Sequence, residues 1–390
     1  MADYRVGSLA DRRANTAILL CALAVSLILR FAAPAQAQSD IASICPSDPI
    51  APRGREYTPG GYILTSFDRS ALWVYDITGN RRYPLPETYP CTTNCRLSPD
   101  ARWLLYFNDA TNSYNRMRVD GTQRTLVSEY ASQIEWWSPD TWLIWTPGRQ
   151  AYLQRQDSAE REYLNVRGVS SIQPGGRWGV LSQPDGDGFR RALINLSNRA
   201  EQIDLGIDLA YYNDSTWSPD GLRFVYVAPV FADGDEETPI GSELHTISPT
   251  SPTPIRITSF ASSYGNVRIN GVAASALSWS PDSSRLAFWV IDLSQPQAEQ
   301  TARIHVLDMG TRTVNSYCRF STTTHTPNPP RLVWSPDGTQ LAFGADIADD
   351  TRPTLLLTLD LTSGIVTIMS EGLYPALGTP DVAAWGLPPG

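Results

Sequence analysis

The sequence predicts an all-β fold, a seven-bladed β-propeller with four antiparallel strands in each blade. Three observations lead to this prediction. A Ser-Pro-Asp turn signal recurs along the chain, and each copy lies between two short apolar runs. The copies and their degenerate relatives follow one another at spacings of 35 to 62 residues. A second turn signal rich in Asp and Gly falls inside several repeats. Such self-similarity is typical of propellers and solenoids, and a solenoid would need capping repeats at two open ends.

The clearest repeat spans residues 332–343, with the sequence Leu-Val-Trp-Ser-Pro-Asp-Gly-Thr-Gln-Leu-Ala-Phe. Pro336 presets φ for the second position of a tight turn, and Gly338 tolerates a positive φ at its exit. The side chain of Asp337 can accept hydrogen bonds from nearby backbone N–H groups. Two apolar runs across such a turn predict a β-hairpin.

The same turn recurs along the chain as a Pro-Asp pair, and we interpret these pairs as structural turns. The pairs are Pro99 and Asp100, Pro139 and Asp140, Pro219 and Asp220, Pro281 and Asp282, and Pro336 and Asp337. Degenerate copies occur near Pro59, Pro174 and Pro388. We letter the four strands of each repeat a to d in chain order. If strands a and b meet at these turns, strands c and d meet at the second turn signal, for example at Asp308 and Gly310.

The first blade is expected to take its innermost strand from the C-terminus, at residues 381–386. Its other strands fall between about Tyr62 and Pro86. Closing the ring in this way removes the open sheet edges that would invite aggregation. Alternatively, a segment before Tyr57 forms the innermost strand of the first blade, and the C-terminal strand is then an extra one. The alternative number of blades is eight.

These Trp-Ser-Pro-Asp-Gly-x-x-Leu-Ala-Phe strings resemble the WD40-like propeller repeats of the TolB type, which also occur in the propellers of prolyl-oligopeptidase relatives. The resemblance covers about residues 57–388 and implies the propeller fold. It implies little about chemistry, because a fold does not carry a function by itself. The chain departs from TolB itself, because no separate α/β domain of TolB size fits before the first repeat.

Residues 1–37 have the pattern of an export signal peptide, with an uncleaved N-terminal anchor as the alternative. Arg5, Arg12 and Arg13 precede an apolar core at 17–29, and Ala35-Gln36-Ala37 offers small residues for cleavage. Residues 38–56 are then a tail or linker, and residues 57–390 form the propeller. We therefore expect an exported bacterial protein that is periplasmic, secreted or on the cell surface.

Four cysteines would remain after export, and an even number in an exported chain predicts two disulfides. We favour Cys91–Cys95, a local pair, together with Cys45–Cys318, which would pin the tail to the sixth blade. Metal binding is the alternative, but the chain has no Cys-x-x-Cys pair and its three His are scattered.

The net charge is −9, and it becomes −11 without residues 1–37, which hold four Arg and two Asp. An acidic chain without a basic cluster argues against nucleic acid and against anionic membrane surfaces as partners. Contact with a membrane is expected only through an uncleaved N-terminal anchor.

The longest connections point to one face of the predicted disc. The a–b and c–d turns share one face, so the b–c and d–a connections lie on the other. The long segments there belong to blades 5–7 and are residues 229–241, 261–271, 292–301, 321–330, 345–353 and 371–380. Long loops on a rigid scaffold are common binding sites. The candidate partner-binding residues are Phe231, Asp233, Glu236, Tyr264, Arg268, His325, Asp346, Asp350, Arg352 and Tyr374.

No catalytic motif was found: the sequence has no Gly-x-Ser-x-Gly, no His-Glu-x-x-His and no phosphate-binding Gly-rich loop. Residues 233–237 and 185–188 carry clustered carboxylates suited to Ca²⁺, but neither segment has the twelve-residue ligand spacing. We therefore expect polar turns there and predict no cofactor.

The favoured hypothesis is a non-catalytic scaffold that binds a protein or peptide through the loops of blades 5–7. The alternative is a propeller enzyme, a glycosidase or lyase, with carboxylates from different blades near the central channel.

Overall fold

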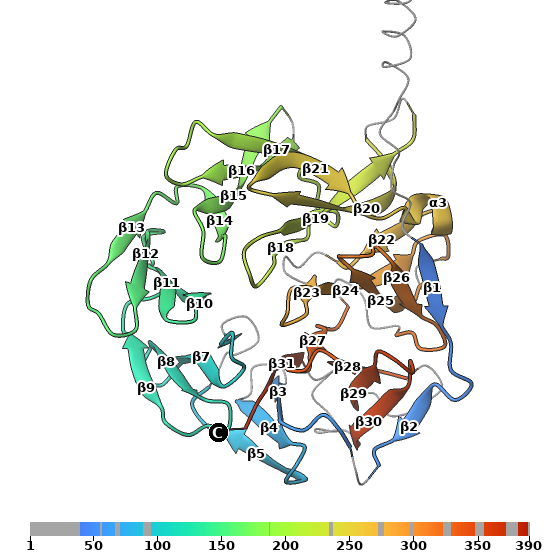
Figure 1. The fold of residues 1–390 in the computed structure, drawn as a ribbon, viewed down its shortest axis with the longest axis horizontal. Coiled ribbons are helices and arrows are strands. Elements are labelled where there is room, and N and C mark those ends of the chain that lie inside the picture. Colours follow the sequence, from blue (N-terminus) through green and yellow to red (C-terminus); the bar gives the residue numbers. More distant parts are fainter. Residues whose placement is uncertain are drawn as a thin grey trace, which may run out of the picture. The chain divides into compact units, whose positions relative to one another are not determined.

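The computed structural model of this chain describes a propeller that begins at residue 40. The residues that it describes are 40–54, 57–66, 71–88, 95–186, 188–233, 237–271, 277–296, 299–322, 329–347, 355–371 and 381–388. Seven small sheets stand in a ring, and each is built on a plan of four antiparallel strands, lettered here a to d from the centre outward (Figure 1). The prediction of a seven-bladed propeller is confirmed.

Blades 1 to 3 follow the predicted four-strand plan. Blade 1 consists of β31 (Asp381–Gly386), β3 (Tyr62–Ser66), β4 (Leu72–Asp76) and β5 (Arg81–Leu85). Blade 2 consists of β6 (Arg96–Leu97), β7 (Trp103–Asn108), β8 (Ser113–Arg118) and β9 (Thr125–Ser128). Blade 3 consists of β10 (Gln133–Ser138), β11 (Thr141–Trp145), β12 (Ala151–Arg155) and β13 (Glu162–Leu164).

Blades 4 and 5 have longer middle strands. Blade 4 consists of β14 (Val169–Ile172), β15 (Trp178–Asp185), β16 (Gly188–Asn195) and β17 (Gln202–Ile207). Blade 5 consists of β18 (Ser215–Trp217), β19 (Phe224–Phe231), β20 (Pro239–Ser248) and β21 (Ser251–Arg256). The short helix α3 (Phe260–Tyr264) lies in the connection that leaves blade 5.

Blades 6 and 7 each gain an outer strand from the N-terminal tail. Blade 6 contains β22 (Val267–Ile269), β23 (Ser278–Trp279), β24 (Arg285–Asp292), β25 (Ala302–Asp308) and β26 (Val314–Tyr317). Blade 7 contains β27 (Val333–Trp334), β28 (Gln340–Ala345), β29 (Leu355–Asp360) and β30 (Val366–Glu371). The tail strands β1 (Ile41–Ile44) and β2 (Ile50–Pro52) pair in parallel with β26 and β30. The segment expected to be a tail or linker therefore covers two sheet edges.

The C-terminal strand closes the ring as predicted. β31 is the innermost strand of blade 1 and pairs antiparallel with β3, with Ile63 opposite Trp385. Figure 1 shows the last, red strand of the chain beside the blue strands of blade 1. The two ends of the propeller segment therefore share one sheet.

The a–b turns of blades 2, 5, 6 and 7 share one geometry. In each, the backbone N–H of the fourth residue donates to the carbonyl of the first, a Ser, at 2.8–2.9 Å. The fourth residues are left-handed, with φ between 56° and 70°, and are Ala101, Gly221, Ser283 and Gly338. In blade 7 the hydroxyl of Ser335 donates to Asp337 at 2.6 Å and accepts from the N–H of Gln340 at 2.9 Å. The turn is therefore stabilised by its own side chains.

The core is divided among the interfaces between neighbouring blades. Seven buried apolar clusters occupy these interfaces, and Trp217, Trp279, Trp334 and Trp385 are each at most 9% exposed. The indole N–H of Trp334 crosses from blade 7 to donate to the carbonyl of Ser278 in blade 6 at 2.9 Å. These repeat tryptophans therefore act as packing residues between blades.

A disulfide fastens the N-terminal tail to blade 6. It joins Cys45, which follows β1, to Cys318, which follows β26, with their Cα atoms 5.1 Å apart. Cys95 is also disulfide-bonded. Its predicted partner Cys91 lies outside the described residues.

The inner strand of blade 6 differs from the expected one. The sequence predicted a loop at 261–271 and a strand leading directly into Trp279. Instead, α3 and β22 occupy this segment, and β22 and β23 pair with the two ends of β24. Arg268 therefore lies on a strand and not on a loop. Within the part of the chain that the structure describes, no helix is long and apolar enough to cross a membrane.

Candidate interaction face

The b–c and d–a connections of all seven blades lie on one face of the ring, which we call the loop face. This follows from the alternating strand directions within each antiparallel sheet. The stereotyped a–b turns and the c–d turns lie on the opposite face. The chemistry of the loop face is therefore set by the residues at the two kinds of connection.

Five exposed apolar side chains lie at the loop-face ends of blades 4 to 6. Phe189 and Ile240 lie next to b–c connections, Ile207 ends β17, and Tyr211 and Tyr264 lie in d–a connections. Their exposed fractions lie between 38% and 55%. We call these five residues the blade 4–6 patch. Among the described turns of the opposite face, Leu222 is the exposed large hydrophobic residue.

The helix that carries Tyr264 is held by a buried carboxylate. Glu243 of β20 is 1% exposed and accepts hydrogen bonds from the backbone N–H groups of Phe260 and Ala261, both at 2.9 Å. It also accepts from the hydroxyl of Thr258 at 2.6 Å. These N–H groups open the helix and have no partner within it, so a neighbouring blade strand satisfies them.

Tyr264 reaches from the surface to a buried histidine. Its hydroxyl lies 3.2 Å from Nε2 of His305, and Nδ1 of His305 lies 3.1 Å from the carbonyl of Arg303. A carbonyl can only accept, so Nδ1 carries the proton and Nε2 accepts from Tyr264. Burial lowers the pKa of His305 to about 4 because it disfavours the charged imidazolium. The imidazole is therefore neutral at pH 7 and acts as a fixed acceptor.

Tyr211 is paired with a cation across a blade boundary. The guanidinium of Arg268 on β22 lies over the ring of Tyr211, 5.0 Å from its centroid. Burial lowers the pKa of Arg268 below its ordinary value. Arg268 therefore presents a positive charge within the otherwise apolar patch.

The connection that carries Tyr211, residues 208–214, is anchored by a buried arginine. Arg191 of β16 is 2% exposed and donates to the carbonyls of Asn213 and Val227 at 2.6 and 2.7 Å. Its guanidinium also lies 4.9 Å from the ring centroid of Tyr226. Desolvation lowers its pKa, whereas the negative charges of Asp208 and Asp214 oppose that shift. One buried guanidinium therefore joins this connection to strands of blades 4 and 5.

A separate hollow lies on the loop face between blades 2 and 3. Its volume is about 630 Å³, and its walls include Phe107, Asp109, Tyr114, Glu129, Tyr130 and Pro147. These residues come from the b–c connections of blades 2 and 3, the strand ends beside them, and the d–a connection between the blades. We call it the blade 2–3 hollow.

An ion pair lies at the inner strands of blades 7 and 1. Nε of Arg331 is 3.9 Å from the carboxylate of Asp381, the first residue of β31. Burial raises the pKa of Asp381, and the positive charge of Arg331 counteracts this shift. Glu135 on the inner strand of blade 3 accepts a hydrogen bond from Gln133. Within the described residues, no group of three or more His, Cys, Asp or Glu is arranged to hold a metal ion.

The predicted site residues are distributed unevenly over this face. Tyr264 and Arg268 lie in or beside the patch, whereas Phe231 ends β19 and Asp233 is exposed beyond it. Asp346 follows β28 and accepts a hydrogen bond from Thr322. Five of the predicted residues lie outside the described part of the chain, namely Glu236, His325, Asp350, Arg352 and Tyr374.

Sequence reasoning missed Phe189, Ile207, Tyr211 and the whole blade 2–3 hollow. The missed residues lie in or beside short connections, whereas the prediction took its candidates from the longest connections. A signal was present in the sequence, because Tyr211 and Tyr212 interrupt a polar segment between two predicted strands. An aromatic pair in a connection is unusual enough to have marked this segment.

Comparisons with known proteins find similar solved structures but no sequence relative. No family model matches the sequence, and no curated protein matches it significantly. Similar solved structures include TolB from Acinetobacter baumannii, 13% identical over 91% of this chain and 98% of that chain, with a TM-score of 0.39. They also include an oligogalacturonate lyase from Vibrio parahaemolyticus, which is 11% identical over 81% of this chain and 87% of that chain, with a TM-score of 0.49. A puromycin hydrolase is 18% identical over 73% of this chain and 48% of that chain, with a TM-score of 0.42. These likenesses assign neither a family nor an activity to this chain.

Proposed function

We propose that this protein is an exported, non-catalytic propeller that binds a protein or peptide partner through its loop face. The observation that carries the proposal is the blade 4–6 patch. Exposed apolar patches rimmed by polar residues mark interaction sites, and aromatic residues are enriched in the centres of interfaces. Two tyrosines on buried polar supports match that description.

The proposed binding surface extends the predicted one from blades 5–7 to blade 4. Phe189 and Ile207 belong to blade 4, and the backbone N–H of Asp208 donates to the carbonyl of Phe189 at 2.8 Å. Tyr211 follows within the same connection and contacts Arg268 of blade 6. The contact of Tyr211 with Arg268 therefore links the connection that leaves blade 4 to blade 6.

The proposed location outside the cytoplasm is supported by the disulfide chemistry. Disulfides form and persist in oxidising compartments, and they are rare in the bacterial cytoplasm. Cys45–Cys318 joins two distant parts of the chain, and Cys95 is also bonded. These bonds favour a periplasmic, secreted or cell-surface protein.

Affinity capture with matched variants tests the proposal. The protein is used to capture partners from its own cell envelope and growth medium, beside the variant Phe189→Ser with Tyr211→Ser. Leu222→Ser, which changes an exposed apolar residue on the opposite face, is the control. We expect one partner to be retained by the wild type and by the control and lost by the patch variant, with equal melting temperatures. Retention by all three would refute the proposed surface, and no specific capture by any would favour a search for enzymatic activity.

A further inference from the structure

The blade 2–3 hollow has an aromatic wall. Phe107 and Tyr114 lie opposite each other on β7 and β8, with ring centroids 5.3 Å apart in an edge-to-face arrangement. The hydroxyl of Tyr114 donates to the carbonyl of Ser132 at 3.0 Å. Tyr130 at the mouth is 78% exposed, so most of its ring faces solvent. The hollow therefore offers ring surface that the protein itself does not cover.

Two carboxylates face the same hollow without a cation. Asp109 and Glu129 line it from two different connections, and both are exposed. Among the described residues, no Arg lines the hollow and neither carboxylate forms an ion pair. Two like charges at one mouth repel each other, so a bound cation would be favoured.

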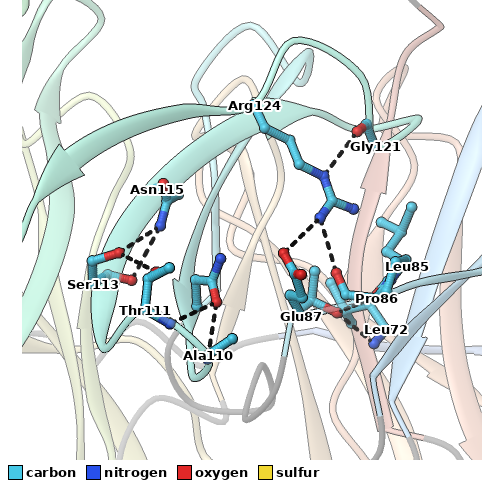
Figure 2. A network of polar contacts seen from close by, with 12 residues as sticks. Leu72, Leu85, Pro86, Glu87, Ala110, Thr111, Ser113, Asn115, Gly121 and Arg124 are labelled. Carbon is cyan, nitrogen blue, oxygen red and sulfur yellow. Dashed lines mark hydrogen bonds and ion pairs between the residues drawn. The ribbon is translucent and has the colours of Figure 1, made fainter.

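The turn that carries Asp109 is fixed by its own hydrogen bonds. The side-chain oxygen of Asn108 accepts from the backbone N–H groups of Ala110 and Thr111 at 3.0 and 3.3 Å. The hydroxyls of Thr111 and Ser113 lie 2.7 Å apart, and Asn115 donates to Ser113 at 3.0 Å, as Figure 2 shows. A fixed turn loses little conformational entropy when a ligand binds.

The same blade is braced on its other side. Arg124 of blade 2 donates to the carbonyl of Pro86 in blade 1 at 2.9 Å and lies 3.8 Å from Glu87 (Figure 2). Its Nε donates to the carbonyl of Gly121 at 3.2 Å. Blade 2 is therefore held against blade 1 on the side away from the hollow.

From these observations we infer that the blade 2–3 hollow binds an arginine side chain of a peptide partner. A guanidinium is planar, stacks on aromatic faces and hydrogen-bonds carboxylates in a fixed geometry. It would meet both the exposed ring of Tyr130 and the unpaired charges of Asp109 and Glu129. A neutral ligand would leave both charges unpaired. The inference rests on the proposed function in one respect, since it takes the arginine to belong to the partner.

Binding of a defined peptide probe tests the inference without the partner. The probe is acetyl-Ala-Arg-Ala-amide, with acetyl-Ala-citrulline-Ala-amide as its uncharged match, and binding to the full protein is measured by calorimetry. We expect the arginine peptide to bind and the citrulline peptide to bind at least about tenfold more weakly. Asp109→Asn with Glu129→Gln should weaken arginine binding about tenfold, and Tyr130→Ala about threefold. Glu160→Gln, which removes a carboxylate from a c–d turn, should leave binding unchanged.

Added salt should also weaken binding, because the carboxylates are exposed and screened. The inference is overturned if the arginine peptide does not bind, if both peptides bind equally, or if the double carboxylate variant binds like the wild type. The capture experiment on the blade 4–6 patch uses other residues. Retention of the partner by the patch variant together with intact arginine binding would therefore refute the proposed function alone. Loss of the partner by the patch variant without any arginine binding would refute this inference alone.

Discussion

Asp214 and Asn270 are 56 residues apart and are joined by a hydrogen bond of 2.8 Å from the side-chain amide of Asn270 to Oδ2 of Asp214. The same oxygen accepts from the backbone N–H of Leu277 at 3.0 Å. Asn270 follows β22 and Leu277 precedes β23, so one buried carboxylate holds both sides of the interruption in the inner strand of blade 6.

Replacing Asp214 should destabilise the propeller. Asp214→Ala leaves two buried donors without this acceptor and removes a negative charge near Arg191, so we expect a loss of about 3 kcal/mol or more. Asp214→Asn keeps an acceptor oxygen and should cost about 1 kcal/mol. Urea unfolding measures both, with Asp233→Ala as an exposed control. A loss below about 0.5 kcal/mol for Asp214→Ala would show that blade 6 does not depend on this carboxylate.

The stability of the protein should fall as the pH drops from about 6.5 towards 4. Burial lowers the pKa of His305 and of His245 to about 4, so over this range the unfolded chain binds protons that the folded protein excludes. Each histidine should therefore reduce the free energy of unfolding by about 1.4 kcal/mol per pH unit. The contribution is constant above the unfolded pKa of about 6.5.

Single substitutions separate the contribution of each histidine to the pH dependence of stability from the contribution of the carboxylates. In His305→Phe, the slope of the free energy of unfolding between pH 6 and 5 should decrease by about 1.4 kcal/mol per pH unit. His245→Phe should give the same change, and the double variant twice that change. An unchanged slope in His305→Phe would mean that the folded protein protonates this ring as readily as the unfolded chain does.

Removing the Cys45–Cys318 disulfide should loosen the tail before it unfolds the ring. The bond closes a loop across a sequence separation of 273 residues, and bonds across long loops stabilise proteins by about 3–5 kcal/mol. In Cys45→Ala with Cys318→Ala, we expect a loss of that order and fast hydrogen exchange at β1. The amides of β24 and β25 serve as the internal reference. Unchanged protection of β1 would show that strand pairing alone holds the tail.

Two turns that share one geometry should respond to substitution in opposite directions. Gly338 and Ala101 occupy the same left-handed turn position, with φ of 70° and 56°. Gly338→Ala should destabilise the protein by about 1 kcal/mol, because a Cβ is unfavourable in that conformation. Ala101→Gly relieves this strain and should be neutral or stabilising by a few tenths of a kcal/mol. Equal losses in both variants, measured by thermal unfolding, would contradict this account.

The blade number and ring closure could be predicted because their signals are local and repeated. Pro336 and Gly338 specify a turn without tertiary help, and Trp334 marks the strand before it. The same logic failed in blade 6, where the inner strand is interrupted and Asn270 depends on Asp214 from another connection. A contact between residues 56 apart leaves no mark in local spacing.

The candidate site was only partly predictable for a related reason. Connection length drew attention to Tyr264 and Arg268, and both lie in or beside the patch. It could not reveal that Tyr211 contacts Arg268, because that contact crosses a blade boundary. The blade 2–3 hollow was missed because Asp109 and Glu129 belong to short connections that meet only in the folded ring.

Both ends of the described chain are structural parts of blades that are distant in sequence. Blade 1 needs β31 from the last residues, and the outer edges of blades 6 and 7 need β1 and β2 from the first. During synthesis, β1 must wait for a partner about 270 residues later, and the ring stays open until β31 has been made. Such a chain cannot finish folding from its N-terminus onward. Its ring becomes complete only when β31 has been made and can pair with β3.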